Sequence, residues 1–164
     1  MSYSWYKNTR NIFFLFLTLF VFFTLFIPVT FIPYNTYALK NFAQDIFSMI
    51  PPQDSIVLEK KKEFGSLVGN GDHCDFYASI VLQSDLSESE LLEYYRKGYK
   101  GGSEMGILKL SDDNEVNSDN VLLLVRDQIN DMKSKASGDN INKLFILYIY
   151  EPDYVSGIGD LRCG

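Results

Sequence analysis

The chain has 164 residues, two cysteines and a formal net charge of −6. All 21 acidic residues but only 13 of the 15 basic ones follow position 33, so this part of the chain has a net charge near −8. Such acidity argues against nucleic acid as a partner, because phosphates require a basic surface. The length suffices for one domain with a hydrophobic core.

Residues 12–33 are predicted to form a membrane-spanning helix. This stretch contains no charged residue, and residues 12–32 would extend roughly 32 Å as a helix, close to the thickness of the hydrocarbon core of a bilayer. Pro28 and Pro33 lack an amide donor, so we expect the helix to kink or to end near them.

The charges that flank this span predict its orientation. Lys7 and Arg10 precede it, so the positive-inside tendency predicts that residues 1–11 are cytoplasmic and residues 34–164 extracytoplasmic. The predicted localisation is therefore the cell membrane, crossed once. Cleavage after Ala38, as in a signal peptide, stays open as an alternative, but the apolar run is longer than a signal peptide usually has.

Residues 34–52 are predicted to contain a juxtamembrane amphipathic helix. Apolar residues recur there at spacings of three and four: Leu39, Phe42, Ala43, Ile46, Phe47 and Ile50. Pro51 and Pro52 are expected to stop the helix. Its apolar face would lie on the membrane surface or dock onto the following domain, and the few basic residues on its polar face favour docking.

Residues 53–164 are predicted to form the extracytoplasmic domain, which begins with a β-hairpin. Residues 55–67 and 76–83 have the composition of strands, and the second is rich in β-branched and aromatic residues. The Gly-Asn-Gly-Asp sequence at 69–72 favours a turn, because glycine and asparagine tolerate positive φ. The two strands should therefore pair in antiparallel fashion.

A helix is predicted to begin after Ser87. Ser87 and Glu90 form a capping-box pattern, and Gly98 is expected to end the helix in the C′ position. The expected buried stripe consists of Leu91, Tyr94, Tyr95 and Tyr99.

The remaining elements complete the predicted fold. Residues 105–110 favour a strand, 111–120 an acidic loop, and 143–150 a central strand that is covered on both faces. Residues 121–137 fit either a strand or a helix, and their spacing favours a helix. The predicted fold class is α+β: an N-terminal transmembrane helix followed by a small antiparallel-sheet domain with one or two packed helices.

The two cysteines predict a disulfide. An extracytoplasmic domain lies in a compartment where disulfides persist, so Cys74 and Cys163 are expected to pair. Closing a loop of this length would stabilise the fold by roughly 4–5 kcal/mol.

The sequence Asp72-His73-Cys74-Asp75 is the one cluster that combines a nucleophile, a base and carboxylates. Neighbouring side chains on a strand point to opposite faces, and an oxidised Cys74 is no nucleophile. A zinc site that also uses Cys163 lacks the close ligand spacing typical of such sites. No catalytic or metal residue is therefore predicted, and no cofactor.

The acidic loop does not match a calcium-binding loop. An EF-hand that began at Asp113 would need glycine at position 118 and glutamate at 124, where this chain has Ser118 and Leu124. A solvated acidic loop is the favoured interpretation.

The GNGDHCDF turn, the LSESELLEYY helix start and the terminal DLRC, behind an N-terminal span, are the basis of one resemblance. Over residues 50–164 the chain resembles small bacterial proteins that are membrane-anchored or exported and have no assigned activity. The resemblance implies an envelope location and the pairing of Cys74 with Cys163.

Three functional hypotheses follow. The favoured one is a single-pass membrane protein whose outer domain binds another protein or stabilises a membrane complex; the predicted partners are thus the membrane and an unidentified protein. The second is an immunity or inhibitor protein, for which small size, acidity and an anchor are suitable. The third is an extracytoplasmic hydrolase with an unrecognised site.

Overall fold

The computed structural model describes residues 3–67, 73–111, 121–135, 138–156, 160, 162 and 163. Four strands, β1 (Ser55–Gly65), β2 (His73–Ser84), β3 (Glu104–Lys109) and β4 (Leu144–Ser156), form one antiparallel sheet in the order β1-β2-β4-β3. The helices are α1 (Tyr3–Phe47), α2 (Glu88–Gly98) and α3 (Val121–Lys135), and a short 3-10 helix, Gly138–Lys143, precedes β4. The predicted α+β fold class is confirmed.

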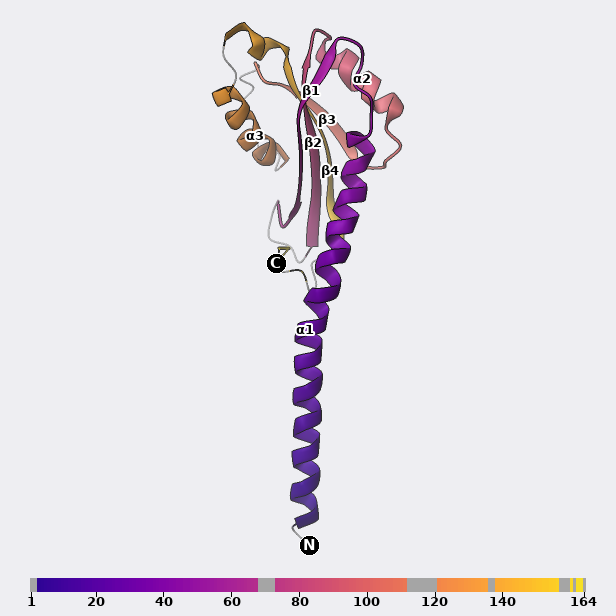
Figure 1. Cartoon of the computed structure of the whole chain (residues 1–164), viewed down its shortest axis with the longest axis vertical. Helices are drawn as coiled ribbons and strands as arrows, with labels where there is room; N and C mark the ends of the chain where they lie inside the picture. Colours follow the sequence, from indigo (N-terminus) through magenta and orange to yellow (C-terminus); the bar gives the residue numbers. More distant parts are fainter. Residues whose placement is uncertain are drawn as a thin grey trace.

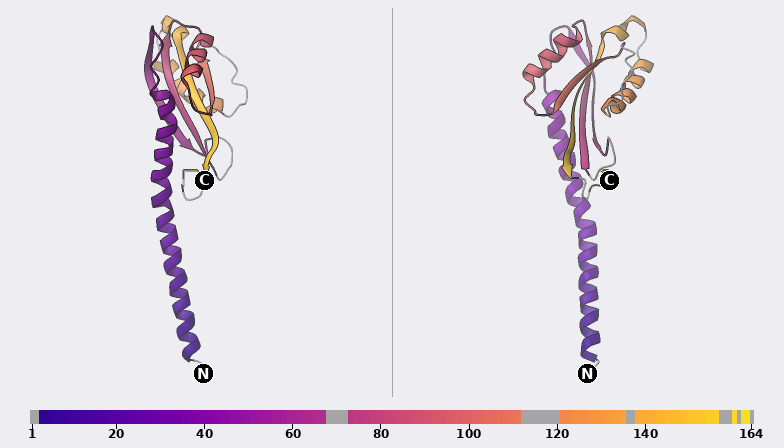
Figure 2. Two further views of the ribbon diagram at one scale, coloured as in Figure 1. Left: turned by 90° about the vertical axis from the view of Figure 1, so that its right-hand side faces the viewer. Right: turned by 180° about the vertical axis from the view of Figure 1, so that it is seen from behind.

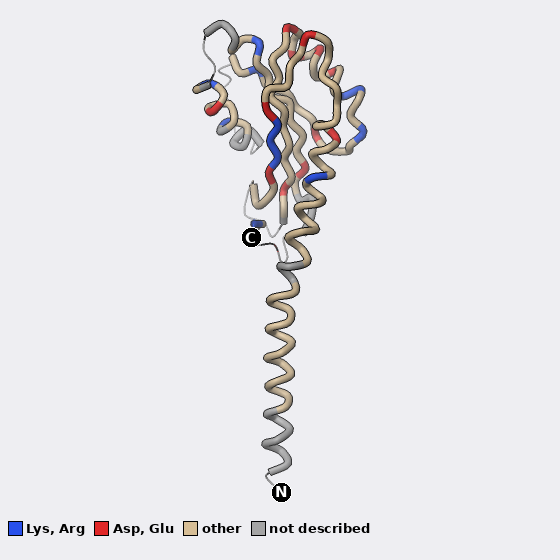
Figure 3. The backbone as a smooth tube through the Cα atoms, viewed as in Figure 1, with Lys and Arg blue, Asp and Glu red and all other residues tan. Residues whose placement is uncertain are grey.

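Helix α1 is a single helix of 45 residues whose N-terminal half projects alone from the domain (Figure 1). We call residues 11–31 of α1 the stem; its sequence contains no charged residue, and the part of it that Figure 3 colours is tan. Within the described chain one helical segment, Asn11–Phe47, is long and apolar enough to cross a membrane, with a mean hydropathy of 2.7 in its most apolar window. The stem therefore has the length and composition of a span.

Helix α1 continues through Pro28 and Pro33 and does not end at either, and a kink there, the other predicted outcome, stays a prediction. A proline removes one helical hydrogen bond, whereas ending the helix in an apolar stretch would leave several backbone groups without partners. Threonine hydroxyls add bonds along the same helix: Thr24 donates to the carbonyl of Phe20 and Thr36 to that of Ile32.

The C-terminal end of α1 is docked onto the sheet, which is the arrangement that the sequence favoured. Leu39, Phe42, Ala43 and Ile46 are buried in a core shared with β2 and α2. Ile50 was expected on the same apolar face, but it is exposed, because the helix ends at Phe47 and its periodicity does not reach that residue.

Strands β1 and β2 form the predicted hairpin, with Ser55 opposite Ser84 and Gly65 opposite Asp75. The predicted turn at 69–72 lies outside the described residues. Alternate β2 side chains face opposite sides of the sheet, and almost all are buried, as two cores share this strand. The first core contains Phe76, Ala78, Ile80 and Leu82, and the second contains Tyr77 and Val81.

Strand β4 lies between β2 and β3, so its predicted central position is confirmed. Gly106 on β3 is opposite Tyr148 on β4, and the ring of Tyr148 lies over it, at the place that a Cβ atom would occupy. Tyr148 also stacks on Tyr77 of β2. A small residue on the edge strand thus makes room for an aromatic side chain of its neighbour.

Helix α2 begins with the predicted capping box, in which Ser87 and Glu90 bond each other reciprocally. The hydrogen bond from the Ser87 hydroxyl and then that from its backbone hold the pKa of Glu90 below its usual range. Tyr94 was expected to be buried but is exposed, and its hydroxyl donates to the carbonyl of Ile50. Gly98 is the last helical residue rather than C′, because the chain leaves the helix in an extended conformation at Tyr99.

Helix α3 covers the face of the sheet opposite to α1 and α2 (Figure 2). It confirms the helical interpretation over 121–135, and residues 136–137 lie outside the described residues. Val125 and Met132 pack in the second core, and the amide oxygen of buried Gln128 accepts from the hydroxyls of Tyr77 and Ser79. Burial raises the pKa of Tyr77 far above its usual range, so this phenol stays protonated and can donate.

Candidate functional site

The described residues of the C-terminal tail lie at the stem-side end of the sheet, where β1 ends and β2 begins (Figure 1). There they contact α1 just above the stem. We call this group of contacts the tail clamp: Asn35, Asp160, Arg162 and the pair Cys74 and Cys163. It joins the C-terminal tail to the middle of α1 and to the start of β2.

Cys74 and Cys163 are joined in a disulfide, with Cα atoms 5.0 Å apart and 89 residues of separation. Both side chains are fully buried. Neither cysteine is free, so the structure offers no thiol for the Cys–His nucleophile considered above. His73 begins β2 next to this bond.

Asp160 is the electrostatic centre of the tail clamp. Its carboxylate accepts from Nε and Nη2 of Arg162 at 2.8 and 2.7 Å, from the Arg162 backbone at 3.2 Å, and from the amide of Asn35 at 2.9 Å. The hydrogen bond from the Arg162 side chain leads these effects, and together they outweigh desolvation and lower the pKa of Asp160 to about 2. The Asp160 side chain is therefore buried as a carboxylate with its charge compensated.

Asn35 contributes the α1 side of the tail clamp. It is 1% exposed, and its amide nitrogen also lies 3.9 Å from the sulfur of Cys74. Its amide oxygen has no hydrogen-bond partner among the described residues. Burying an amide oxygen without a partner costs free energy. The contacts of the Asn35 nitrogen nevertheless connect α1 to the tail and to the disulfide.

Arg162 reaches beyond Asp160 to α1 and β1. Nη2 donates to the carbonyl of Ile32 at 3.2 Å and Nη1 to the hydroxyl of Thr36 at 3.4 Å. The guanidinium carbon lies 3.8 Å from the centre of the Phe64 ring, a cation–π arrangement. Four hydrogen bonds and a ring thus fix its position.

The end of β1 is shaped to receive the tail. The carbonyl of Arg162 accepts from the backbone of Ser66 at 3.2 Å. Gly65 has φ of 150°, and a Cβ atom there would come within 2.8 Å of the same carbonyl. Only glycine combines this backbone conformation with so close an approach.

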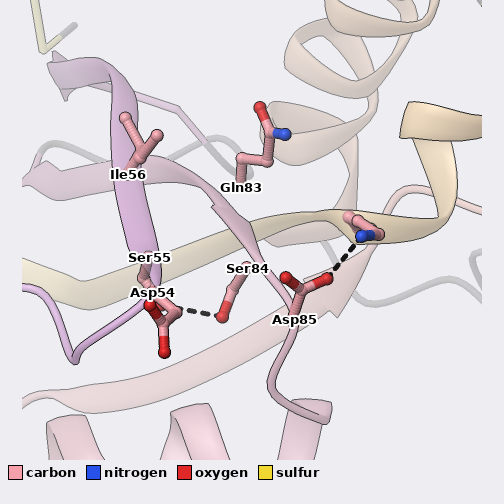
Figure 4. A pocket seen from close by; sticks show the side chains of 7 residues that line it. Asp54, Ser55, Ile56, Gln83, Ser84 and Asp85 are labelled. Atoms are coloured by element: carbon pink, nitrogen blue, oxygen red, sulfur yellow. Dashed lines mark hydrogen bonds and ion pairs between the residues drawn. The ribbon is translucent and has the colours of Figure 1, made fainter.

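A second feature is a pocket of about 450 Å³ at the opposite end of the sheet, which we call the tip pocket (Figure 4). Ser55 and Ser84 line it, and their hydroxyl oxygens are 2.7 Å apart. Asp85 pairs with Lys143, and Ile56 is 62% exposed at the rim. The serines bond to each other and close the strand ends, so this geometry does not activate a nucleophile.

The described residues hold no group of three or more His, Cys, Asp and Glu side chains placed to bind a metal ion. The acidic loop at 112–120 and the turn at 69–72 lie outside the described residues, so their predicted structures stay predictions.

Sequence reasoning missed three members of the tail clamp, although the sequence contains signals for them. Asn35 lies one turn before Leu39 on the apolar face of the docked helix, and a polar residue there requires a buried partner. Asp160 and Arg162 precede Cys163, so a disulfide that pins the cysteine also carries these charges to the sheet. Their partners are distant in sequence, which is why the pattern alone did not pair them.

Comparison with family models, curated proteins and solved structures gave no match for this chain. The resemblance to small bacterial envelope proteins therefore stays a prediction.

Proposed function

We propose that this chain is a single-pass membrane protein that holds a small interaction domain at a fixed height outside the cytoplasmic membrane, with its N-terminus in the cytoplasm. The observation that carries the proposal is the continuity of α1, which enters the domain core at Leu39 with no linker after the stem. A domain attached in this way changes its orientation together with the anchor helix when that helix tilts.

The tail clamp supports this rigid attachment. Without it, the domain would pivot on the single helix near residues 33–36. Arg162 bonds Ile32 and Thr36 at the two ends of that segment, and the disulfide holds the tail to β2. Two attachments at one level resist bending better than one.

The same geometry favours a permanent anchor over a cleaved signal peptide. Ala38, the residue before the candidate cleavage point, lies within α1 and packs against the core, and Leu39 is buried. A protease would have to unwind a docked helix to reach this bond. Cleavage would also separate Asn35 from the rest of the tail clamp.

The surface offered to a partner lies at and near the tip pocket. Outside α1, four large apolar side chains are exposed among the described residues: Ile50, Ile56, Leu58 and Tyr94. Exposed apolar groups rimmed by polar ones are typical of protein contact sites. Because the tip is the end of the sheet farthest from the stem, it is accessible to a protein that approaches from outside.

Labelling tests the topology. We expect a membrane-impermeant maleimide to modify Ser89→Cys in intact cells and to modify Ser2→Cys only after lysis; Ser89 is exposed on α2. The wild-type chain, whose two cysteines are bonded to each other, is the unlabelled control. The reverse pattern would refute the orientation.

Photo-cross-linking in living cells tests the interaction surface. A photoreactive residue at Ile56 should form a discrete adduct with a protein, whereas one at Glu93, exposed on the outer face of α2, should not. Equal adducts at both positions, or none at Ile56, would contradict a partner at the tip.

A further inference from the structure

Arg162 is held at the height where the apolar run of α1 ends. Its guanidinium bonds the carbonyl of Ile32, the last residue of that run, and the hydroxyl of Thr36, about 6 Å farther along the helix axis. If the stem spans a bilayer, this is the depth at which hydrocarbon gives way to phosphate groups.

We propose that Arg162 binds the phosphate of an outer-leaflet phospholipid, so that the tail clamp also fixes the depth of the domain on the membrane. The proposal rests on the membrane insertion proposed above. The chemistry recognised is a phosphate oxygen, which accepts a charge-assisted hydrogen bond from a guanidinium N–H.

The hydrogen bonds of Arg162 leave room for such a ligand. A guanidinium has five N–H donors. Four are used in the structure: two by Asp160, one by Ile32 and one, at the long distance of 3.4 Å, by Thr36. The fifth, on Nη1, has no partner among the described residues, and the Arg162 side chain is 39% exposed.

Arg162 is more exposed than its ion-pair partner Asp160, and this difference favours an anionic ligand. The Asp160 side chain is 0% exposed, whereas the Arg162 side chain is 39% exposed. An approaching phosphate therefore meets the positive partner first. Because Asp160 and Arg162 together are neutral, the ligand is held by the directed hydrogen bond from Nη1 more than by net charge.

The aromatic residues at the same level agree with this depth. Tyr34 and Tyr37 are exposed on α1, on the side of the helix that does not carry Asn35 and Leu39. Tyrosines gather at membrane interfaces, where the ring meets apolar chains and the hydroxyl meets water and headgroups. The exposed tyrosines of α1 and Arg162 of the tail thus lie at the same level of the helix.

Solid-state NMR measures the proposed contact directly. The full chain, labelled with ¹³C on the arginine guanidinium carbons, is reconstituted into phosphatidylglycerol–phosphatidylethanolamine bilayers, and ¹³C–³¹P dipolar dephasing is recorded. The variant Arg10→Lys removes the arginine that flanks the other end of the span. Three arginines remain, Arg96, Arg126 and Arg162, so the contact predicts dephasing of about one third of the signal. No dephasing would overturn the proposal.

Arg96 is the internal control for the dephasing, because its guanidinium donates to the carbonyl of Met105 on the domain, away from the stem. In the double variant Arg10→Lys with Arg162→Lys, the dephasing should vanish; its persistence would assign it to another arginine and overturn the proposal. The measurement with Arg162 intact does not depend on whether this double variant folds.

Two further measurements identify the source of the phosphate and, if no dephasing is seen, show whether the chain is inserted in the membrane. Frozen maltoside micelles with inorganic phosphate should give no dephasing, and dephasing equal to that in bilayers would mean a general phosphate site rather than a lipid contact. Carbonate extraction of the reconstituted vesicles tests insertion separately. If the chain is extracted, both proposals fall; if it stays and Arg162 shows no dephasing, only the lipid contact falls.

Discussion

Asp160→Asn tests whether the tail clamp stabilises the domain through charge. Asparagine keeps the shape of the side chain but replaces one acceptor oxygen with a donor, which faces the donors of Arg162 and Asn35. The pKa of Asp160 falls from 3.8 to about 2 in the folded state. At about 1.4 kcal/mol per pH unit, the charged form is favoured by about 2–3 kcal/mol, and we expect the variant to lose that amount at pH 7.

The pH dependence has a definite sign. Because the folded pKa lies below the unfolded value, the stabilisation is complete above about pH 4 and disappears as the pH falls towards 2. The wild-type chain and the variant should therefore differ in free energy of unfolding at pH 7 and converge near pH 2. Protonation of the other carboxylates is common to both proteins and cancels in the difference.

Urea unfolding of the full chain in maltoside micelles, followed by circular dichroism, measures this difference. Glu93→Gln is the matched control, since Glu93 pairs with Lys97 on the exposed face of α2 and its loss should leave the urea midpoint unchanged within error. The electrostatic reasoning is refuted if Asp160→Asn unfolds at the wild-type midpoint at pH 7, or if the two curves stay apart at pH 2.

Three more substitutions probe other parts of the fold, each by the same urea titration. Cys163→Ser should lower the free energy of unfolding by about 4–5 kcal/mol, as the bond closes a loop of 89 residues, and added reductant should not lower it further. Gly106→Ala places a methyl group against the ring of Tyr148 and should cost about 1–3 kcal/mol; a neutral result would mean that the ring moves aside freely. Ser87→Ala removes the N-cap and should cost about 1 kcal/mol, whereas Ser89→Ala should change little.

Local patterns predicted the elements whose structure depends on neighbours in sequence. The capping box at Ser87 and Glu90 needs only residues three apart, and the run of β-branched and aromatic residues in β2 directly indicates a buried strand. The docked face of α1 was visible for the same reason, because Leu39, Phe42 and Ala43 recur at helical spacing.

Prediction failed where distant contacts override a local rule. Pro33 would end an isolated helix, but the docked residues that follow it hold the chain in helical form. Tyr94 follows the helical stripe of α2 and yet is exposed, because its hydroxyl reaches the loop at Ile50. The Asn35–Asp160 bond spans 125 residues, and no periodicity reports such a pair.

The position of the tail clamp explains why a small domain combines a continuous helix with a covalently fixed tail. A helix alone determines the orientation of the domain, but the helix can still bend at the last turn before it enters the core. The second attachment lies on the opposite side of that turn, through Arg162 to Ile32 and through Cys163 to Cys74. Loss of either link should therefore loosen this attachment before the sheet unfolds, because the second core contains neither cysteine. Spin labels on the stem and on α2 would report this as a broader distance distribution in Arg162→Gln at a urea concentration where the sheet is intact.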